Sequence, residues 1–312
     1  MTMNMINKES QSEHSDEINL QEIFFAIVEK KLFIFSISGL FALSSIIFSL
    51  VVPKMWVSDS LLSLSQQNNA SQSSSSSLSG MASLAGLRMS GGSAGPDKAE
   101  IVIATINSRD FLKHLISIDD VLPRLMATKT FNEDKNIDEL DPDVYDVSKS
   151  LWINSPPTFF ESYHQYLSTV STHYNPMGSG FISISVKHRS PIFAQNFLNL
   201  IISELNNILR DKDLIEAEAS LKYLYTQLED EFIQSEVRLS ITQLIENQLR
   251  TKMFANIRQN YAVEPLDTAY IPENRFSPQR TKIVLLGTIL GLIFSMIFVL
   301  ARHYLIKNLN QN

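Results

Sequence analysis

The stretch Leu32–Val52 reads LFIFSISGLFALSSIIFSLVV, and a second uncharged stretch, Ile283–Ala301, reads IVLLGTILGLIFSMIFVLA. A helix of about 20 apolar residues is long enough to cross the ~30 Å hydrocarbon core of a membrane. Both stretches are close to this length. The sequence therefore predicts two transmembrane helices, over 32–52 and 283–303, with a long segment, 53–282, between them.

Two alternative interpretations of these stretches are weaker. The first stretch exceeds the ~7–15 apolar residues of a signal peptide, and Val51-Val52-Pro53-Lys54 is not a small-x-small cleavage site. A buried core helix of a soluble protein is the alternative for either stretch, but such a helix rarely runs so far without a charge. We interpret both stretches as uncleaved spans.

The orientation of the chain depends on the basic residues that flank the spans. An even number of spans puts both termini on one side, and basic flanks favour the cytoplasm. The flanks balance, with Lys30, Lys31, Arg302 and Lys307 toward the termini and Lys54, Arg275, Arg280 and Lys282 toward the middle segment. Because the first span usually dominates, we expect cytoplasmic tails at 1–31 and 304–312 and a periplasmic segment at 53–282.

Charge and cysteine content exclude several classes of function. The net charge of −7 argues against a nucleic-acid partner. The chain has no cysteine, so it has no disulfide, thiolate nucleophile or cysteine metal site. The segment 53–282 is long enough for one domain, or two, with a hydrophobic core.

The N-terminal third combines three kinds of sequence. Residues 16–28 favour a short interfacial helix, because apolar side chains fall on one helical face. Residues 55–64 predict a strand that leaves the membrane, with Trp56 at the interface. Residues 65–96 are rich in Ser and Gly, which is typical of a flexible linker; the alternative is a mobile loop that contacts a polymer or a partner.

Helices and strands are both expected in the middle of the chain. Residues 99–117 have helical spacing, with Asp97 as a cap, and 158–167 predict a second short helix. Residues 181–187 alternate apolar and polar side chains after Phe181. Together with 169–174 across a Gly-containing turn, they predict a β-hairpin with one buried face.

A long helical region is expected over 191–262, because the chain has no Gly or Pro between Pro191 and Pro265. One unbroken helix of about 70 residues would be ~100 Å long, so part of it should project or pair with another helix. We expect any break at the charged turn Arg210–Asp213. Since the apolar spacing is not a clean heptad, we expect packing between neighbouring subunits and not a dimeric zipper.

The sequence offers no catalytic constellation, and we expect no enzyme activity, cofactor or metal. The six histidines lack HExxH spacing, and GxSxG is absent. His164, His173 and His188 lie near the predicted hairpin and could converge, but surface or packed histidines are the more ordinary interpretation. The acidic segment 119–149 should be rich in loops. Its carboxylates at 138–143 could suggest calcium, but they lack EF-hand spacing, so we expect a solvated loop there. A sensor is disfavoured because neither end has room for an output domain.

Three segments together resemble the Wzz-type chain-length determinants, or polysaccharide co-polymerases. The first is Ile18–Ile23 (INLQEI) with Lys30-Lys31, the first span and Pro53-x-x-Trp56. The second is Ile182–Val186 followed by Ser190-Pro191-x-x-Ala194-x-x-Phe197-Leu198-Asn199. The third is a proline-rich segment, 263–282, which contains Pro265, Pro272, Pro278 and Arg280 before the second span.

The resemblance implies an α+β membrane protein of the bacterial inner membrane. Two transmembrane helices would flank a periplasmic domain with an α/β base and a long projecting helix. It also implies a homo-oligomer without catalytic residues, which sets the length of a surface polysaccharide, such as O-antigen, made by a Wzy-type polymerase from lipid-linked repeats.

Two features bear on which branch of this family the chain resembles. The Ser/Gly-rich insert is more like that of the exporter-type relatives. The alternative is therefore a capsule or exopolysaccharide co-polymerase that works with a separate tyrosine kinase and an outer-membrane exporter. We expect no fused kinase, because no nucleotide-binding motif occurs before Asn312.

Simple physical roles follow for the singled-out residues. Prolines fix φ and would make 263–282 a stiff, extended connector, although an ordinary turn-rich linker fits them equally well. Gly287 and Gly291 form a GxxxG, and Ser38, Ala42 and Ser49 could share a small face on the first span. Such faces allow helices to approach closely in lipid, so we expect transmembrane packing there.

Overall fold

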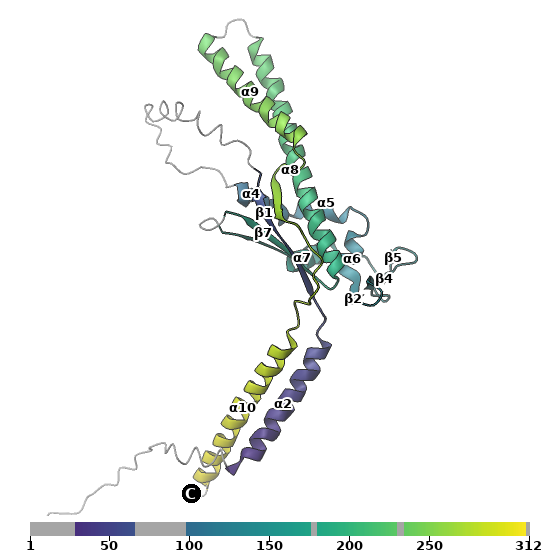
Figure 1. Cartoon of the computed structure of the whole chain (residues 1–312), viewed down its shortest axis with the longest axis vertical. Helices are drawn as coiled ribbons and strands as arrows, with labels where there is room; N and C mark the ends of the chain where they lie inside the picture. Colours follow the sequence, from purple (N-terminus) through teal and green to yellow (C-terminus); the bar gives the residue numbers. More distant parts are fainter. Residues whose placement is uncertain (1–28, 66–97, 176–179, 230–233, 310–312) are drawn as a thin grey trace, which may run out of the picture. The chain divides into compact units, whose positions relative to one another are not determined.

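The computed structural model describes residues 29–65, 98–175, 180–229 and 234–309. It divides into two compact units (Figure 1). The span unit comprises the described residues of 1–52 and 278–312, and the central unit comprises those of 53–277. The predicted interfacial helix at 16–28, nearly all of the Ser/Gly-rich segment and the predicted cap Asp97 lie outside the described residues.

Two apolar helices make up the span unit. Helix α2 runs from Lys31 to Val51, and helix α10 runs from Arg280 to Leu309. Both are long and apolar enough to cross a membrane. Helix α2 ends where Val52 takes an extended conformation before Pro53, which disfavours helix at the residue that precedes it. The two predicted apolar stretches are thus confirmed as helices.

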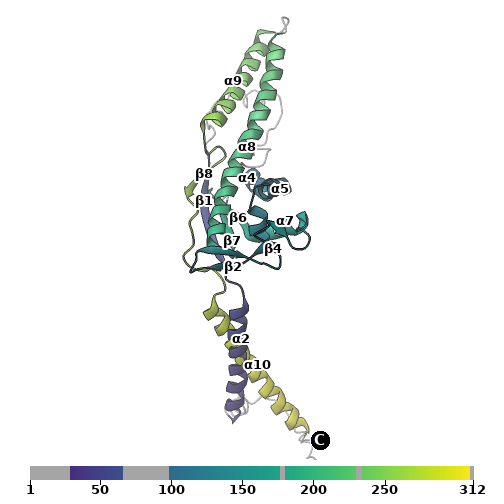
Figure 2. The same ribbon diagram turned by 90° about the vertical axis from the view of Figure 1, so that its right-hand side faces the viewer.

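A four-stranded antiparallel sheet organises the central unit (Figure 2). Its strand order is β6–β7–β1–β8. Strand β1 (Trp56–Leu64) pairs with β7 (Ile182–His188) on one side and with β8 (Val263–Asp267) on the other. Strand β6 (Val170–Tyr174) pairs with β7, which confirms the predicted hairpin.

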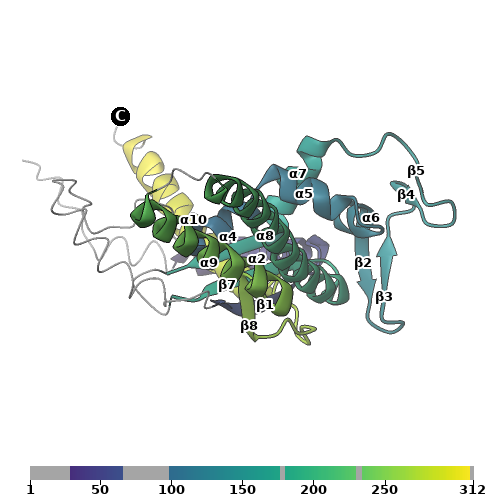
Figure 3. The same ribbon diagram turned by 90° about the horizontal axis from the view of Figure 1, so that it is seen from above.

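Alternation along β7 builds the hydrophobic core. Ile182, Ile184 and Val186 are fully buried, whereas the residues between them are half-buried. Helix α8 (Pro191–Leu228) packs against β1 and β7, and it begins where the Ser190 hydroxyl accepts the Phe193 N–H at 3.0 Å. Figure 3 shows α4, α5, α7 and α8 gathered on one face of the sheet.

Residues 99–117, for which the apolar spacing predicted helix, form two helices. Helix α4 runs from Lys98 to Ile106, and α5 runs from Arg109 to Ile116. Ser108 between them is extended, and its hydroxyl accepts the Phe111 N–H at 3.1 Å. A cap of this kind starts a new helix, so the helical periodicity of the apolar residues is interrupted at Ser108, between α4 and α5.

The predicted short helix at 158–167 is confirmed as α7 (Phe159–Thr169). It begins with a capping box, in which the Glu161 carboxylate accepts the Thr158 N–H at 2.8 Å and the Thr158 hydroxyl accepts the Glu161 N–H. These bonds lower the pKa of Glu161. On the same helix, the buried Tyr166 hydroxyl donates to the Ile106 carbonyl at 2.8 Å, which joins α7 to α4.

The acidic segment 119–149, expected to be rich in loops, contains a helix and short strands, and Asp138, expected in a solvated loop, lies in a strand. An ion pair of 2.8 Å joins Arg124 to Asp138, whose side chain is only 5% exposed. The carboxylates in this segment hold turns and pair with nearby cations, which explains why an acidic sequence forms regular structure. The elements are α6 (Val121–Ala127), the pair β2 (Thr128–Asn132) and β3 (Ile137–Leu140), and the pair β4 (Tyr145–Asp146) and β5 (Leu151–Trp152).

The long helical region forms a helical hairpin. Helix α8 continues through Arg210–Asp213 to Leu228, and α9 (Ser235–Ile257) returns along it (Figure 1). The expected break at Arg210–Asp213 is wrong. Asp211 and Lys212 are exposed there, and the Asp213 carboxylate accepts the Tyr261 hydroxyl at 2.6 Å. Charged residues with such partners are compatible with a continuous helix.

The Trp56 side chain is buried within the central unit, whereas we expected an indole exposed at the membrane interface. It is 5% exposed and packs edge-on against Phe131, with 5.8 Å between ring centroids. Alternation along β1 buries position 56 together with Ser58, Ser60 and Leu62. The indole therefore belongs to the interior of the central unit.

Candidate functional site

The helices of the span unit touch through glycines of α10. A Cβ on Gly287 would collide with the side chain of Ser45. A Cβ on Gly291 would lie 2.7 Å from the Cβ of Phe41 and 3.2 Å from the Cα of Ser38. A larger residue at either position would force the helices apart, so the absence of a side chain sets their spacing.

Serine hydroxyls of α2 bridge the same contact. Ser45 donates to the carbonyl of Ile283 at 2.9 Å, and Ser38 donates to the carbonyl of Thr288 at 3.4 Å. Hydrocarbon offers no acceptor, so a hydroxyl on a lipid-embedded helix needs a protein partner of this kind. The contact between α2 and α10 thus combines close approach of the two backbones with hydrogen bonds from small polar side chains.

The structure places the singled-out small residues along one contact, which we call the α2–α10 seam. It brings Gly291 beside Ser38 and Gly287 beside Ser45. On α2, Ser49 is buried and Ala42 is half-buried. Ser45 and Phe41 were not singled out from the sequence. The signal for Ser45 was the spacing of small residues at 38, 42, 45 and 49, which recurs at helical intervals. A role for this seam in the membrane stays a prediction.

The four residues singled out in the proline-rich segment do not form one site. Pro265 lies within β8, opposite Leu62, and β8 is an edge strand, where proline costs no ladder hydrogen bond. Pro272 lies in the irregular segment that follows β8, whereas Pro278 and Arg280 belong to the span unit. The segment 263–282 is therefore not one uniform connector.

Hydrogen bonds to β1 hold the chain that leads from β8. Ser60 donates to the carbonyl of Asp267 at 2.5 Å, and Ser58 donates to the carbonyl of Tyr270 at 2.8 Å. The Tyr270 hydroxyl donates to Asp59 at 3.1 Å, and this bond to a carboxylate raises the pKa of Tyr270. Side chains of β1 thus order this stretch in addition to its prolines.

A backbone bridge closes the same stretch at the edge of the central unit. The Met55 N–H donates to the Ser277 carbonyl at 2.9 Å, and the Phe276 N–H donates to the Met55 carbonyl at 2.8 Å. The two ends of the central unit's chain, at 53 and 277, therefore lie side by side. An arrangement of this kind fits a domain tethered at both ends.

The three histidines near the predicted hairpin occupy different environments. His188 is buried, its Nδ1 accepts the Ser190 N–H at 3.1 Å, and its ring lies 4.4 Å from that of Phe193. Burial lowers the pKa of His188 to about 4. His164 and His173 are exposed. Among the described residues, no group of three or more His, Asp or Glu is placed to hold a metal ion.

Exposed apolar side chains mark the α8–α9 hairpin as a candidate contact surface. Leu249, Met253 and Ile257 recur every four residues along α9 and are 46%, 47% and 72% exposed. Ile215 and Tyr223 on α8 are also largely exposed. The hairpin packs internally through other positions, such as Ala217, Leu221 and Ile245, which are buried. We call Leu249, Met253 and Ile257 the α9 stripe.

Comparison with known proteins adds two family matches. The model "Wzz: Chain length determinant protein" matches residues 16–118, which include α2, β1, α4 and α5. The model "GNVR: G-rich domain on putative tyrosine kinase" matches residues 234–304, which include α9, β8 and most of α10. In this second match the glycines are Gly287 and Gly291, the two at the seam.

Solved structures provide two further similarities. One is a full-length bacterial polysaccharide co-polymerase, with 11% identity over 93% of this chain and 99% of that chain and a TM-score of 0.40. The other is a fragment of WzzB, a polysaccharide co-polymerase from Salmonella Typhimurium, with 16% identity over 72% of this chain and 100% of that chain and a TM-score of 0.27. A search of curated protein sequences gives no match.

Proposed function

Since the chain belongs to the family of Wzz-type chain-length determinants, or polysaccharide co-polymerases, we propose that it is a non-enzymatic scaffold that regulates the length of a surface polysaccharide. The polymer would be O-antigen or a related glycan, made by a Wzy-type polymerase from lipid-linked repeats. In this role the protein needs no catalytic residue, because its geometry would determine how long the polymer remains in extension.

The observation that supports this proposal is how the two family matches meet in space. They are separated by more than 100 residues, from 118 to 234. Nevertheless β1 from the first match pairs with β8 from the second, and α2 from the first packs against α10 from the second. The two matched regions thus complete each other within each unit, as expected for parts of one scaffold.

The same proposal includes a position in the cell. We place the chain in the bacterial inner membrane, with both termini in the cytoplasm and the central unit in the periplasm. The two span-length helices and the pair Lys30-Lys31 at the start of the first of them support this orientation. Membrane lipid and a lipid-linked glycan would then be partners, and the net charge of −7 disfavours nucleic acid.

Self-association is also part of the proposal. The α9 stripe exposes three large apolar side chains on a hairpin that is already packed internally. A contiguous exposed apolar surface commonly marks a protein contact. We assign a second copy of this chain as its partner in a homo-oligomer.

Deletion of the gene tests the proposed function directly. The deletion strain should make a surface glycan with an altered modal length on gels, and expression of the intact chain should restore the original ladder. An unchanged ladder in the deletion strain would count against length control.

One observation favours a second candidate function. The description of the family model that matches residues 234–304 refers to a domain found on a putative tyrosine kinase. The alternative is therefore a co-polymerase for capsule or exopolysaccharide export, acting with a separate tyrosine kinase and an outer-membrane exporter. Purification of the tagged chain from its host, followed by assay for tyrosine phosphorylation in the eluate, distinguishes the two. A kinase that co-purifies with the chain, together with loss of capsule in the deletion strain, favours the export function. An altered glycan ladder in the deletion strain, with no co-purifying kinase, favours length control.

A further inference from the structure

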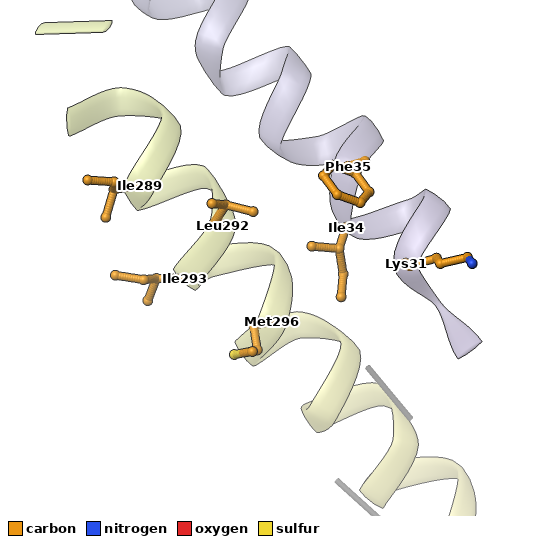
Figure 4. Close-up of a pocket in the computed structure, with 7 residues that line it drawn as sticks. All are labelled: Lys31, Ile34, Phe35, Ile289, Leu292, Ile293 and Met296. Atoms are coloured by element: carbon orange, nitrogen blue, oxygen red, sulfur yellow. The ribbon is translucent and has the colours of Figure 1, made fainter. Parts of the chain in front are cut away.

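A hollow of about 520 Å³ lies between α2 and α10 near the start of α2 (Figure 4). Lys31, Ile34 and Phe35 line it from the first turns of α2. Ile289, Leu292 and Met296 line it from α10. These positions recur every three or four residues, so each helix presents one continuous strip to the hollow. Lys31 is the one charged residue in the lining, and the others are large and apolar.

We propose that this hollow holds an acyl chain of an anionic phospholipid whose phosphate pairs with Lys31. The lining on α10 extends over seven residue steps, or ~10 Å at 1.5 Å per residue, which is about a third of the ~30 Å hydrocarbon thickness. Lys31 is the first residue of α2. In a membrane-spanning α2 its ammonium group lies at the level of the lipid headgroups, and the apolar strips lie at the level of the acyl chains.

The side chains of the hollow favour an acyl chain over a helix of a second copy. Helices that associate in lipid approach each other through small residues. In the span unit, Gly287, Gly291 and Ser38 serve the α2–α10 seam and do not line the hollow. Its wall of branched and flexible side chains lacks the small residues that close helix approach requires, whereas a flexible hydrocarbon chain can fill such a surface.

Charge gives an independent argument for a phosphate. Within the described part of the span unit, Glu29 is the one acidic residue, and its carboxylate pairs with Lys30 at 3.3 Å. The corresponding helices of a second copy would therefore bring Lys31 no free carboxylate. An anionic lipid supplies the missing charge, and basic residues beside transmembrane helices commonly bind such headgroups.

Lipid retention by the full-length protein tests this inference without reference to polysaccharide. The protein is reconstituted in vesicles of phosphatidylcholine and phosphatidylglycerol, extracted gently, and analysed by native mass spectrometry for bound lipid. We expect the wild type to retain phosphatidylglycerol in preference to phosphatidylcholine. Lys31→Gln should retain it about fivefold less, the effect expected for loss of one basic residue at the membrane surface. Leu292→Trp, which fills the hollow, should lose lipid of both kinds.

Two matched variants exclude general effects of charge and size. Lys30→Gln removes the neighbouring cation, which does not line the hollow, and Leu290→Trp adds an indole at an exposed position of α10 outside the hollow. Both should retain phosphatidylglycerol like the wild type. Equal retention by Lys31→Gln and the wild type would overturn the proposal. A changed oligomeric state of Leu292→Trp with normal lipid retention would also overturn it, because the hollow would then be a protein contact.

Discussion

The side chain of Asn206 hydrogen-bonds both backbone groups of Val263. Its Nδ2 donates to the Val263 carbonyl and its Oδ1 accepts the Val263 N–H, each at 3.0 Å, and Oδ1 also accepts the Ala262 N–H at 2.8 Å. Asn206 is 3% exposed on α8, and Val263 begins the edge strand β8. One buried amide thus fixes the long helix to the strand that leads toward the second span.

Asn206→Ala should destabilise the central unit. The variant leaves buried backbone groups of Ala262 and Val263 without partners, and each such group costs about 1–3 kcal/mol. We expect the free energy of unfolding to fall by roughly 3 kcal/mol, measured by denaturant titration of the two tryptophans, both of which lie in the central unit. Asn256→Ala is the control, since Asn256 is exposed and bonds the carbonyl of Lys252 in its own helix. Equal losses in both variants would contradict a special role for Asn206.

His188 should make stability fall in acid. Burial lowers its folded pKa to about 4, whereas an unfolded histidine titrates near 6.5. Between these values the unfolded chain binds a proton that the folded chain does not, so unfolding becomes more favourable as pH falls through this window. At the acid end of this window, the free energy of unfolding should be lower by roughly 3 kcal/mol because of His188. Unfolding measured at intervals from pH 7 to pH 4 should show this slope.

Replacement of the imidazole isolates this contribution. His188→Asn keeps an acceptor for the Ser190 N–H without a titrating group, so its stability should depend less on pH than that of the wild type. His173→Asn changes an exposed histidine and should keep the wild-type slope. If His188→Asn retained the full slope, another group would be responsible.

Features encoded by neighbouring residues could be predicted from the sequence. The two long uncharged apolar stretches identified both span-length helices. The alternation of apolar and polar residues after Phe181 identified β7 and its partner β6. Local signals also misled. The charges at Arg210–Asp213 suggested a break, but the helix continues through them, and the Asp213 carboxylate accepts a bond from Tyr261, 48 residues away.

Features that depend on distant partners could not be predicted. The sequence has no Gly or Pro between Leu228 and Ser235 that would indicate the end of α8. Helix α9 packs along α8 because apolar residues of both helices, such as Leu221 and Ile245, are buried along the hairpin. The bond between Asn206 and Val263 joins residues 57 positions apart. At the seam, the GxxxG was visible in the sequence, but its contact with Ser45 requires knowledge of which face of α2 lies opposite.

The α9 stripe should be required for self-association. Met253→Glu places a carboxylate in the middle of the three exposed apolar residues, and an unpaired charge buried in an interface costs about 3–5 kcal/mol. We therefore expect oligomers in detergent to dissociate more than about a hundredfold more readily, as measured by light scattering over a range of concentrations. Gln243→Glu adds the same charge at an exposed polar position of α9 and should leave the mass unchanged. Full-size oligomers in Met253→Glu would assign the contact to another surface.

The spacing of the two spans should depend on Gly291. Leucine at this position would overlap Phe41 and the backbone of Ser38, because even a Cβ lies 2.7 Å from the Cβ of Phe41. Overpacking of this kind costs about 1–3 kcal/mol, so the helices should separate for a larger fraction of the time. Gly39→Leu is the matched control, since no atom lies within 4 Å of a Cβ built there.

Cysteine cross-linking measures this separation, because the natural chain has no cysteine that would interfere. The rings of Phe33 on α2 and Phe298 on α10 stack with centroids 5.8 Å apart, so Phe33→Cys with Phe298→Cys reports on how closely the spans approach. A short thiol-reactive cross-linker should join this pair about tenfold more slowly in the Gly291→Leu background, the factor that corresponds to ~1.4 kcal/mol. Gly39→Leu should leave the rate unchanged. Equal rates in both backgrounds would mean that the helices tolerate a side chain at the seam, and the glycines would then have no role in holding the spans together.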